Sequence, residues 1–337
     1  MNRFLARALF FFLLTVFFFS CSEDDGPSSQ GEFESGVIVI NEGNFTEGDA
    51  SLSFYSASGN APELNVFEAV NGRKLGDVAQ SGYIYDTLLY IVVNNSNKVE
   101  VLNRYSLKSA YTIDALLPRY MTLAKRKVVL TEWVSFTEPG RLSFIDIASG
   151  QVEGSVTVGA GAEFVKVIGD LAYVSNTFEN TISVVNIDSR LVTETITLPT
   201  AGPNQMDIVN GNLWVACKGT FNANDGAIHR INLSTNEIEE TIAINANISG
   251  KLAFNFAGDK FYYYVENNVF MKDVNSSAIS TEPFIIGDDF TSLYGITVDH
   301  LTDEIYLADS KNFLEDGEVY HYSEDGDLIK SFTVGRG

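Results

Sequence analysis

A pattern of short strands that recurs every forty-odd residues is the feature that most constrains how this chain can fold. Its clearest copy consists of three β-branched segments, Asp170–Asn176, Thr181–Asp188 and Val192–Leu198, each bounded by turn-forming residues. Successive copies open 40 to 48 residues apart, near Gly36, Gly76, Pro118, Gly161, Gly202, Gly250 and Tyr294. The chain is therefore expected to be one repeat array rather than several unrelated domains.

A period in the low forties with four strands per unit is the spacing of a β-propeller. Helical solenoids have similar periods, but no stretch after the first twenty residues keeps the apolar spacing of a helix. The sequence predicts an all-β fold with negligible helix beyond the signal: a seven-bladed β-propeller of four-stranded antiparallel blades over residues 36–337. The first unit, residues 36–72, shows only three strands, whereas the last, residues 294–337, shows four.

The N-terminus reads as an export signal. A basic start is followed by an apolar run from Ala8 to Phe19, which is too short to span a bilayer. Ser20 and Cys21 then precede an acidic stretch. Residues 1–20 are therefore predicted to be a signal peptide and residues 21–35 a flexible tether. No later segment is apolar and long enough to cross a membrane.

The junction at Ser20 and Cys21 resembles that of bacterial lipoproteins, although Phe18 stands where the usual leucine is found. The resemblance implies that Cys21 is acylated and anchors the chain. Simple cleavage near Ser20 is the alternative. In lipoproteins of Bacteroidota, which this N-terminus resembles, acidic residues such as those at 23–25 direct export to the cell surface. The resemblance implies an outer-membrane lipoprotein exposed on the cell surface, with the periplasmic face as the alternative.

The net negative charge of the chain limits the kinds of partner that it can bind. The chain carries 44 acidic and 22 basic residues, a formal net charge of −22. Such a field repels phosphate backbones, so nucleic acid is not an expected partner. The chain has two cysteines, and if Cys21 is acylated, Cys217 has no partner for a disulfide.

The segments Tyr173–Asn176 and Thr181–Asp188 resemble the YVTN-type β-propeller repeat, and variants of it cover residues 36 to 337. The opening Asn41–Phe45 is similar to that of propeller lipoproteins of Bacteroidota, including surface proteins that capture cobalamin beside an outer-membrane transporter. The resemblance implies a surface-anchored lipoprotein that captures a small organic nutrient or cofactor, such as a corrinoid, for a transporter. A protein-interaction scaffold is the alternative.

One face of the predicted ring gathers aromatic residues. The loops between second and third strands, and those between blades, emerge on the same face of a propeller, so features recurring there form a ring. Aromatic and polar side chains around a mouth suit a large, flat, partly polar ligand. The candidate ligand-binding residues are Phe45, Asn94, Arg119, Tyr120, Glu132, Trp133, Phe136, Asn176, Phe178, Phe221, Tyr294 and Phe313. The alternative is that the phenylalanines anchor loops and the polar residues cap backbone groups.

Other kinds of site are not expected. His229, His300 and His321 fall in different repeats, and the acidic clusters around Asp225, Asp316 and Asp325 read first as hairpin turns, so no metal or cofactor is predicted. The residue groups needed for acid, base or nucleophilic catalysis are not visible, so the chain is not expected to be an enzyme.

Overall fold

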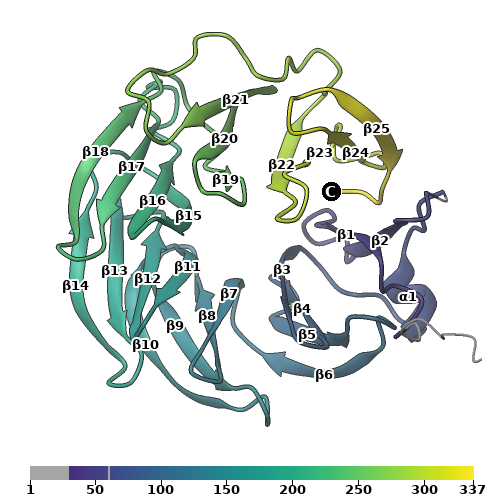
Figure 1. Cartoon of the computed structure of the whole chain (residues 1–337). Coiled ribbons are helices and arrows are strands. Elements are labelled where there is room, and N and C mark those ends of the chain that lie inside the picture. The colour runs from purple at the N-terminus through teal and green to yellow at the C-terminus, as the bar shows by residue number, and fades with distance from the viewer. Residues whose placement is uncertain (1–29, 60) are drawn as a thin grey trace, which may run out of the picture. The chain divides into compact units, whose positions relative to one another are not determined.

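Short antiparallel strands account for most of the described part of the chain. The computed structural model describes residues 30–59 and 61–337, so the predicted signal peptide and Cys21 lie outside the described residues. The described residues form 25 β-strands and one α-helix. In Figure 1, the sheets of residues 31–337 follow one another around a common axis. The predicted all-β propeller is confirmed.

Five sheets have four strands each, in sequence order. The first contains β3 (Ala79–Tyr85), β4 (Leu88–Val93), β5 (Lys98–Asn103) and β6 (Ser109–Asp114). The second contains β7 (Pro118–Ala124), β8 (Lys127–Glu132), β9 (Pro139–Asp146) and β10 (Val152–Ala160), and the third β11 (Ala162–Ile168), β12 (Leu171–Asn176), β13 (Thr181–Asn186) and β14 (Leu191–Thr197). The fourth contains β15 (Pro203–Val209), β16 (Asn212–Cys217), β17 (Ala227–Asn232) and β18 (Glu237–Ala243), and the fifth β22 (Leu293–Val298), β23 (Ile305–Asp309), β24 (Glu318–Tyr322) and β25 (Leu328–Thr333).

Two sheets are smaller. One has three strands, β19 (Ala253–Phe254), β20 (Lys260–Val265) and β21 (Asn268–Asp273), and the other has only β1 (Gly36–Asn41) and β2 (Ser51–Ser56). The prediction of seven four-stranded blades is therefore wrong. The described residues form six blades of three or four strands, and the first repeat forms only a two-stranded sheet.

The first repeat stops short for a local reason. After β2, Glu63 makes a single bridge to Phe54, next to Pro62, which has no N–H to continue a ladder. The chain then enters α1 (Val66–Asn71), whose Val66 and Phe67 are buried. This six-residue helix is the one helix in the described part of the chain, in agreement with the negligible helix content expected beyond the signal. No helix in the described part of the chain has the length and apolarity needed to span a membrane.

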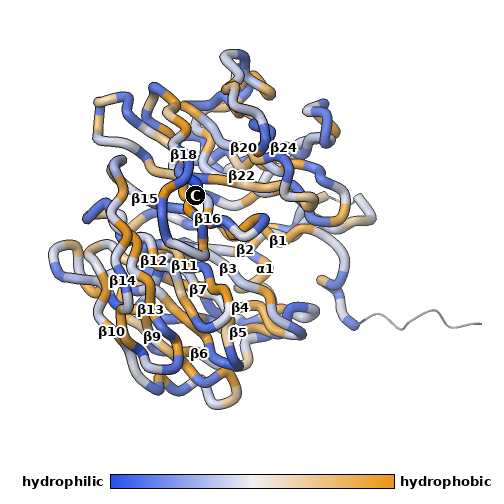
Figure 2. Tube along the Cα trace, turned by 60° about the vertical axis from the view of Figure 1, so that its left-hand side comes forward, coloured by the Kyte–Doolittle hydropathy of each residue, from blue (hydrophilic) through white to orange (hydrophobic). Residues whose placement is uncertain are grey.

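The core lies between neighbouring sheets. Tyr173 and Val184 of one sheet pack with Met206 and Val215 of the next, and all four are buried. Figure 2 shows apolar stretches mostly along the strands. Burial of each such side chain contributes roughly 1.5–3 kcal/mol. Because both faces of a sheet are covered, its strands do not alternate cleanly between apolar and polar residues.

The first and last sheets also pack together. Val39 and Tyr55 contact the cluster of Val319, Phe332 and Val334. The Tyr55 and Phe332 rings are stacked with their centroids 4.3 Å apart. The ring is therefore closed by side-chain packing between sheets, and the sheet of β1 and β2 contains no strand from the C-terminal end.

Candidate functional site

A cavity of about 480 Å³ lies at the centre of the ring. Residues of β1 and of the first strands of the four-stranded sheets line it, together with Lys251 just before β19. Its polar lining includes Glu42, Gln80, Tyr120, Lys166, Gln205, Lys251 and Tyr294. Tyr120 and Tyr294 are predicted site residues that line this cavity.

A repeated backbone irregularity presents these side chains. In β7, Pro118 and Met121 pair with Glu132 and Leu130, so β7 holds one more residue than β8 over this stretch. Such a bulge re-aims side chains and is common beside active sites. The same irregularity occurs near the start of β3, β11, β15 and β22. The residues in the bulges are Gln80, Arg119, Tyr120, Glu163, Phe164, Asn204, Gln205 and Tyr294.

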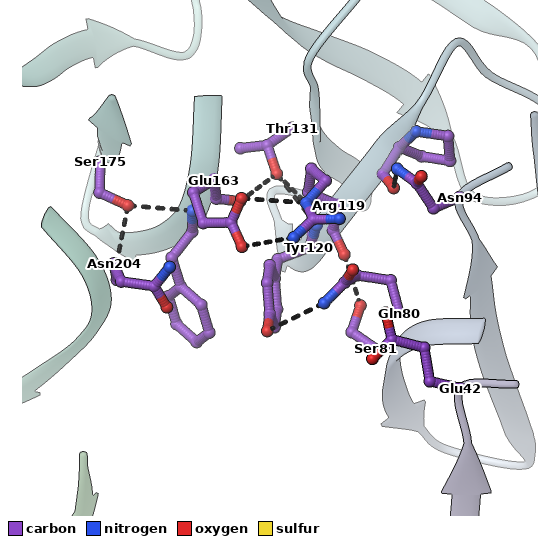
Figure 3. A network of polar contacts seen from close by, with 12 residues as sticks. Glu42, Gln80, Ser81, Asn94, Arg119, Tyr120, Thr131, Glu163, Ser175 and Asn204 are labelled. Carbon is purple, nitrogen blue, oxygen red and sulfur yellow. Dashed lines mark hydrogen bonds and ion pairs between the residues drawn. The ribbon is translucent and has the colours of Figure 1, made fainter. Parts of the chain in front are cut away.

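Buried hydroxyl groups hold the bulges and join neighbouring sheets (Figure 3). The Thr131 hydroxyl accepts the Tyr120 N–H at 3.0 Å and donates to the Glu163 carbonyl at 2.6 Å. Ser175 repeats the arrangement one sheet further on, where it donates to the Asn204 carbonyl at 2.8 Å. The bulges are therefore fixed by a hydrogen-bond network that crosses from one blade to the next.

Tyr120 is the centre of one polar cluster. Its hydroxyl lies 3.2 Å from Lys251 Nζ and 3.5 Å from Gln80 Nε2, and its ring lies 4.5 Å from that of Phe164. The electrostatic influence of Tyr120 raises the pKa of Lys251 above its ordinary value, against the opposing effect of burial.

Arg119 forms the second cluster. Its Nε and Nη2 atoms donate to both Glu163 carboxylate oxygens, at 2.9 and 2.8 Å, as Figure 3 shows. Burial opposes the charge of Arg119, but the attraction and hydrogen bonds of Glu163 raise its pKa. The guanidinium carbon also lies 4.0 Å from the centroid of the Trp133 ring. Two charged groups and an indole are thus held as one unit.

An aromatic shelf, defined here as Trp133, Phe136 and Phe178, lies beside Arg119. The Trp133 centroid is 5.6 Å from that of Phe136 and 5.1 Å from that of Phe178. Phe136 and Phe178 are 62% and 50% exposed. The buried indole Nε1 has no hydrogen-bond partner among the described residues. The shelf therefore offers apolar area and an unused donor.

The opposite side of the mouth carries a second aromatic pair. The Tyr294 hydroxyl donates to Glu42 at 2.6 Å, and its ring meets Phe313 edge-on at 5.4 Å. Burial, followed by the charge of Glu42, raises the pKa of Tyr294. The Tyr294 hydroxyl therefore stays protonated, and its hydrogen bond engages one oxygen of the Glu42 carboxylate.

Two lysines at the mouth lack carboxylate partners within the described part of the chain. Lys251 bonds through Nζ to Tyr120 alone, and no ion pair forms at Lys218, whose side chain lies against Gly250. Burial and the positive charges of Lys251 and Arg119 lower the pKa of Lys218, although Glu163 opposes them. By contrast, carboxylates pair with Lys98, Lys125, Lys127, Lys166 and Lys311.

Three predicted site residues lie inside the fold instead of at the mouth. Asn94 is buried and donates to the Pro118 carbonyl at 2.9 Å. Glu132 is buried and receives two hydrogen bonds from Arg141, at 2.6 and 2.7 Å. Asn176 is buried and donates to Thr181 and Ser183 at 2.9 Å each. Their contacts are those of structural residues that fix strand ends.

Two predicted phenylalanines stand apart. Phe221 is 88% exposed and Phe45 is 60% exposed. Neither makes a ring contact with another aromatic residue in the ranges that the structure describes. The structure therefore gathers Arg119, Trp133, Phe136 and Phe178 into one cluster and does not add Phe45 or Phe221 to it.

Sequence reasoning missed Gln80, Glu163, Lys218 and Lys251. Two of them share a signal that is present in the repeat: Gln80 and Glu163 each stand one residue after the start of a first strand, as Arg119 and Asn204 do. Once the bulge near the start of each first strand is known, polar residues at that point indicate which side chains lie near the cavity.

Solved structures of several kinds are similar to this chain. A quinoprotein alcohol dehydrogenase-like protein from Bacteroides thetaiotaomicron is 13% identical with a TM-score of 0.70, covering 90% of this chain and 76% of that one. The hydrazine synthase of Kuenenia stuttgartiensis is 14% identical with a TM-score of 0.64, covering 74% and 84%. A computationally designed protein, Ika8, is 9% identical with a TM-score of 0.60, covering 88% and 87%. At these identities the likeness shows the fold alone.

Sequence comparison gives a family but no characterised relative. No curated protein matches the sequence. Residues 35–335, nearly all of the described ring, match the family described as Domain of unknown function (DUF5074). The chain therefore belongs to the DUF5074 family.

Proposed function

We propose that this propeller is a binding protein that captures a flat organic ligand bearing an anionic group. The observation that carries the proposal is the pair Lys218 and Lys251, which lack carboxylate partners in the described chain although the protein has a net charge of −22. In so acidic a chain, cations left without a counter-charge beside a cavity are suited to a charge brought by a ligand.

The aromatic shelf supplies the second half of the site. Trp133, Phe136 and Phe178 offer rigid rings against which a planar ligand can stack. Gln205 also lines the cavity, where its Nε2 already donates to the Leu252 carbonyl at 2.6 Å. A ligand of this description would bridge the shelf and the two lysines.

A corrinoid fits this description. Its macrocycle is large and flat, and in cobalamins it carries a phosphodiester. The proposal follows the resemblance of the sequence to YVTN-type lipoproteins that capture cobalamin. The corresponding cellular role is capture at the outer membrane, with Cys21 as the lipid anchor, and delivery of the unchanged ligand to a transporter.

Calorimetric titration of the purified chain with cyanocobalamin and with cobinamide, which lacks the phosphodiester, tests both halves of the site. We expect Trp133→Ala to weaken both ligands, and Lys218→Gln with Lys251→Gln to weaken cyanocobalamin alone. Lys260→Gln, an exposed change at the start of β20, is the matched control. Absence of binding to both compounds would exclude a corrinoid, and haem then serves as a second planar anion.

The alternative role, a protein-interaction scaffold, is favoured by Phe221, which is 88% exposed and outside the aromatic shelf. Aromatic residues, phenylalanine among them, are enriched in the buried centres of protein interfaces. If this role is correct, Phe221→Ala should abolish capture of an outer-membrane transporter while Trp133→Ala leaves it unchanged. The opposite pattern supports ligand capture.

A further inference from the structure

The second edge of β1 has no strand partner among the residues that the structure describes. In each four-stranded sheet, the second strand lies between a first and a third strand. β1 pairs with β2 alone.

Side-chain contacts show which strand position β1 occupies. Asn41 at its end donates to Ser51 and Ser53, at 3.0 and 2.8 Å. Asn176, at the end of the second strand β12, makes the same two contacts, with Thr181 and Ser183. β1 and β2 therefore correspond to the second and third strands of a blade. In residues 30–59 and 61–337, no strand occupies the position equivalent to β11, the first strand.

The backbone groups facing that position can be identified. Hydrogen-bonded and non-hydrogen-bonded pairs alternate along an antiparallel ladder. Phe54 exchanges both of its backbone hydrogen bonds with Glu63, at 2.9 and 2.8 Å, so its pair with Ile38 is of the non-hydrogen-bonded kind. By alternation, Ile38 and Ile40 direct their N–H and C=O groups away from β2. No partner for these four groups is recorded within the described residues.

The central cavity follows this edge along its length. Every residue from Val37 to Glu42 lines it. On the other sides lie Gly82 of β3 and a mainly apolar wall from the last sheet, comprising Ile296, Leu307, Ala308, Val319 and Val334. An occupant is thus offered backbone hydrogen bonds on one side and apolar packing against the last sheet, while polar side chains such as Gln80, Tyr120 and Lys251 line other parts of the cavity.

We propose that an extended, apolar segment of another polypeptide binds here as the first strand of this blade, antiparallel to β1. Strand addition to an open sheet edge is an established mode of peptide recognition, in which backbone hydrogen bonds supply affinity and side-chain pockets supply specificity. Six residues at 3.4 Å each would span roughly 20 Å, the length of β1. The segment must be a tail or loop, because the ring encloses the position.

This proposal does not depend on the small-molecule function. It uses the backbone of β1, whereas the proposed ligand is held by Trp133, Lys218 and Lys251. Variants of those three residues should leave peptide binding unchanged.

Residue-resolved amide hydrogen exchange on the full chain tests the proposal. The probe is a capped synthetic peptide with the sequence of β11, residues 162–168, a first strand of the same molecule. We expect the Ile38 and Ile40 amides to exchange rapidly alone and at least tenfold more slowly with saturating peptide. The Val37 and Val39 amides, bonded to β2, should be protected in both states.

The free peptide can bind too weakly to be detected, so a second variant joins the same sequence to Gly337 through a Gly-Ser linker. Gly337 lines the cavity, and a tether raises the effective concentration of the peptide to about millimolar. The matched control carries the same linker with a Gly-Ser segment in place of the strand. Protection of Ile38 and Ile40 only with the strand sequence supports the proposal. Equal exchange in both chains overturns it, as does full protection of these amides in the unextended protein.

Proline substitution gives an independent check. Ile38→Pro removes an N–H from the open edge, whereas Val39→Pro removes one that bonds β2. Ile38→Pro should abolish peptide binding with a smaller loss of stability than Val39→Pro. If it retains peptide binding, the peptide does not pair with β1.

Discussion

The Arg119 guanidinium lies 4.0 Å from the centroid of the Trp133 ring while Nη2 donates to Glu163 at 2.8 Å. The side chain is therefore fixed on two sides, by a ring face and by a paired carboxylate. Lysine cannot reproduce both contacts, because it lacks the planar fork of arginine.

We expect Arg119→Lys to lower the free energy of unfolding by about 1–2 kcal/mol and to change the fluorescence of Trp133. Urea unfolding and emission spectra provide the measurements. Arg126→Lys, in the exposed turn between β7 and β8, is the control and should change neither. An unaltered emission spectrum in Arg119→Lys would contradict the stacked arrangement.

Trp133→Ala should weaken ligand binding by about 2 kcal/mol, because an anchoring aromatic in a binding site supplies much of the affinity. The loss is measured by titration beside the melting temperature. Asp325→Ala, in the turn before β25, is the comparison. If Trp133→Ala only melts earlier and binds normally, the shelf is a packing cluster.

Glu132→Gln should destabilise the fold by roughly 2–3 kcal/mol. The carboxylate is buried, receives both Arg141 hydrogen bonds and accepts the Leu116 N–H at 2.6 Å, so its charge is satisfied on several sides. Glu138→Gln, in the exposed loop before β9, is expected to be neutral. Equal stability of the two variants in urea would show that the Glu132 network contributes little.

Glu100 is expected to link stability to acid pH. Burial alone would raise its pKa, but hydrogen bonds from Arg73, Lys98 and Ser109 lower it below the ordinary value. A carboxyl whose pKa is lower in the folded state stabilises the fold above its unfolded pKa, and this contribution is lost as pH falls through the folded pKa.

Urea unfolding of the native chain should therefore show a fall in stability on the acid side of pH 4.5. Glu100→Gln should be less stable at neutral pH and show a shallower fall. Parallel pH curves for the two proteins would argue against this role of Glu100.

Anion binding at the mouth should weaken at alkaline pH. The pKa of Lys218 is lowered chiefly by burial and by its positive neighbours, so Lys218 loses its charge before an ordinary lysine does. Affinity for cyanocobalamin should then decline as pH rises through that pKa. In Lys218→Gln the decline should be absent, and its persistence there would assign it to another group.

The repeat in the sequence predicted the ring because four β-branched segments per unit leave little choice of fold. It marked the first unit as the irregular one but indicated three strands there, whereas its sheet has two. The fourth-strand position beyond β2 is not filled by a strand in the described chain, because Pro62 and α1 divert the first unit after β2. That diversion depends on how Phe67 packs between sheets, which no local pattern records.

The candidate site was predicted in part for a similar reason. Trp133, Phe136 and Phe178 recur at one point of the repeat, so ring closure brings them to one face. Lys251 was missed because it precedes a strand of only two residues, and its contact with Tyr120, 131 positions away, exists only after the ring closes. The Asn94 amide donates to the Pro118 carbonyl and that of Asn176 to the hydroxyls of Thr181 and Ser183, so a polar residue at a strand end does not by itself indicate a ligand contact.

At the repeated bulge, the backbone conformation does not depend on which side chain the bulged residue carries. The backbone bulges of β7 and β11 are held by the hydroxyls of Thr131 and Ser175, which contact main-chain atoms and make no demand on the side chain being displayed. Gln80, Arg119, Glu163, Asn204 and Tyr294 stand at the corresponding points of five first strands with five different side chains. Recognition in this ring can be rewritten one blade at a time, at constant architecture, by exchanging single side chains.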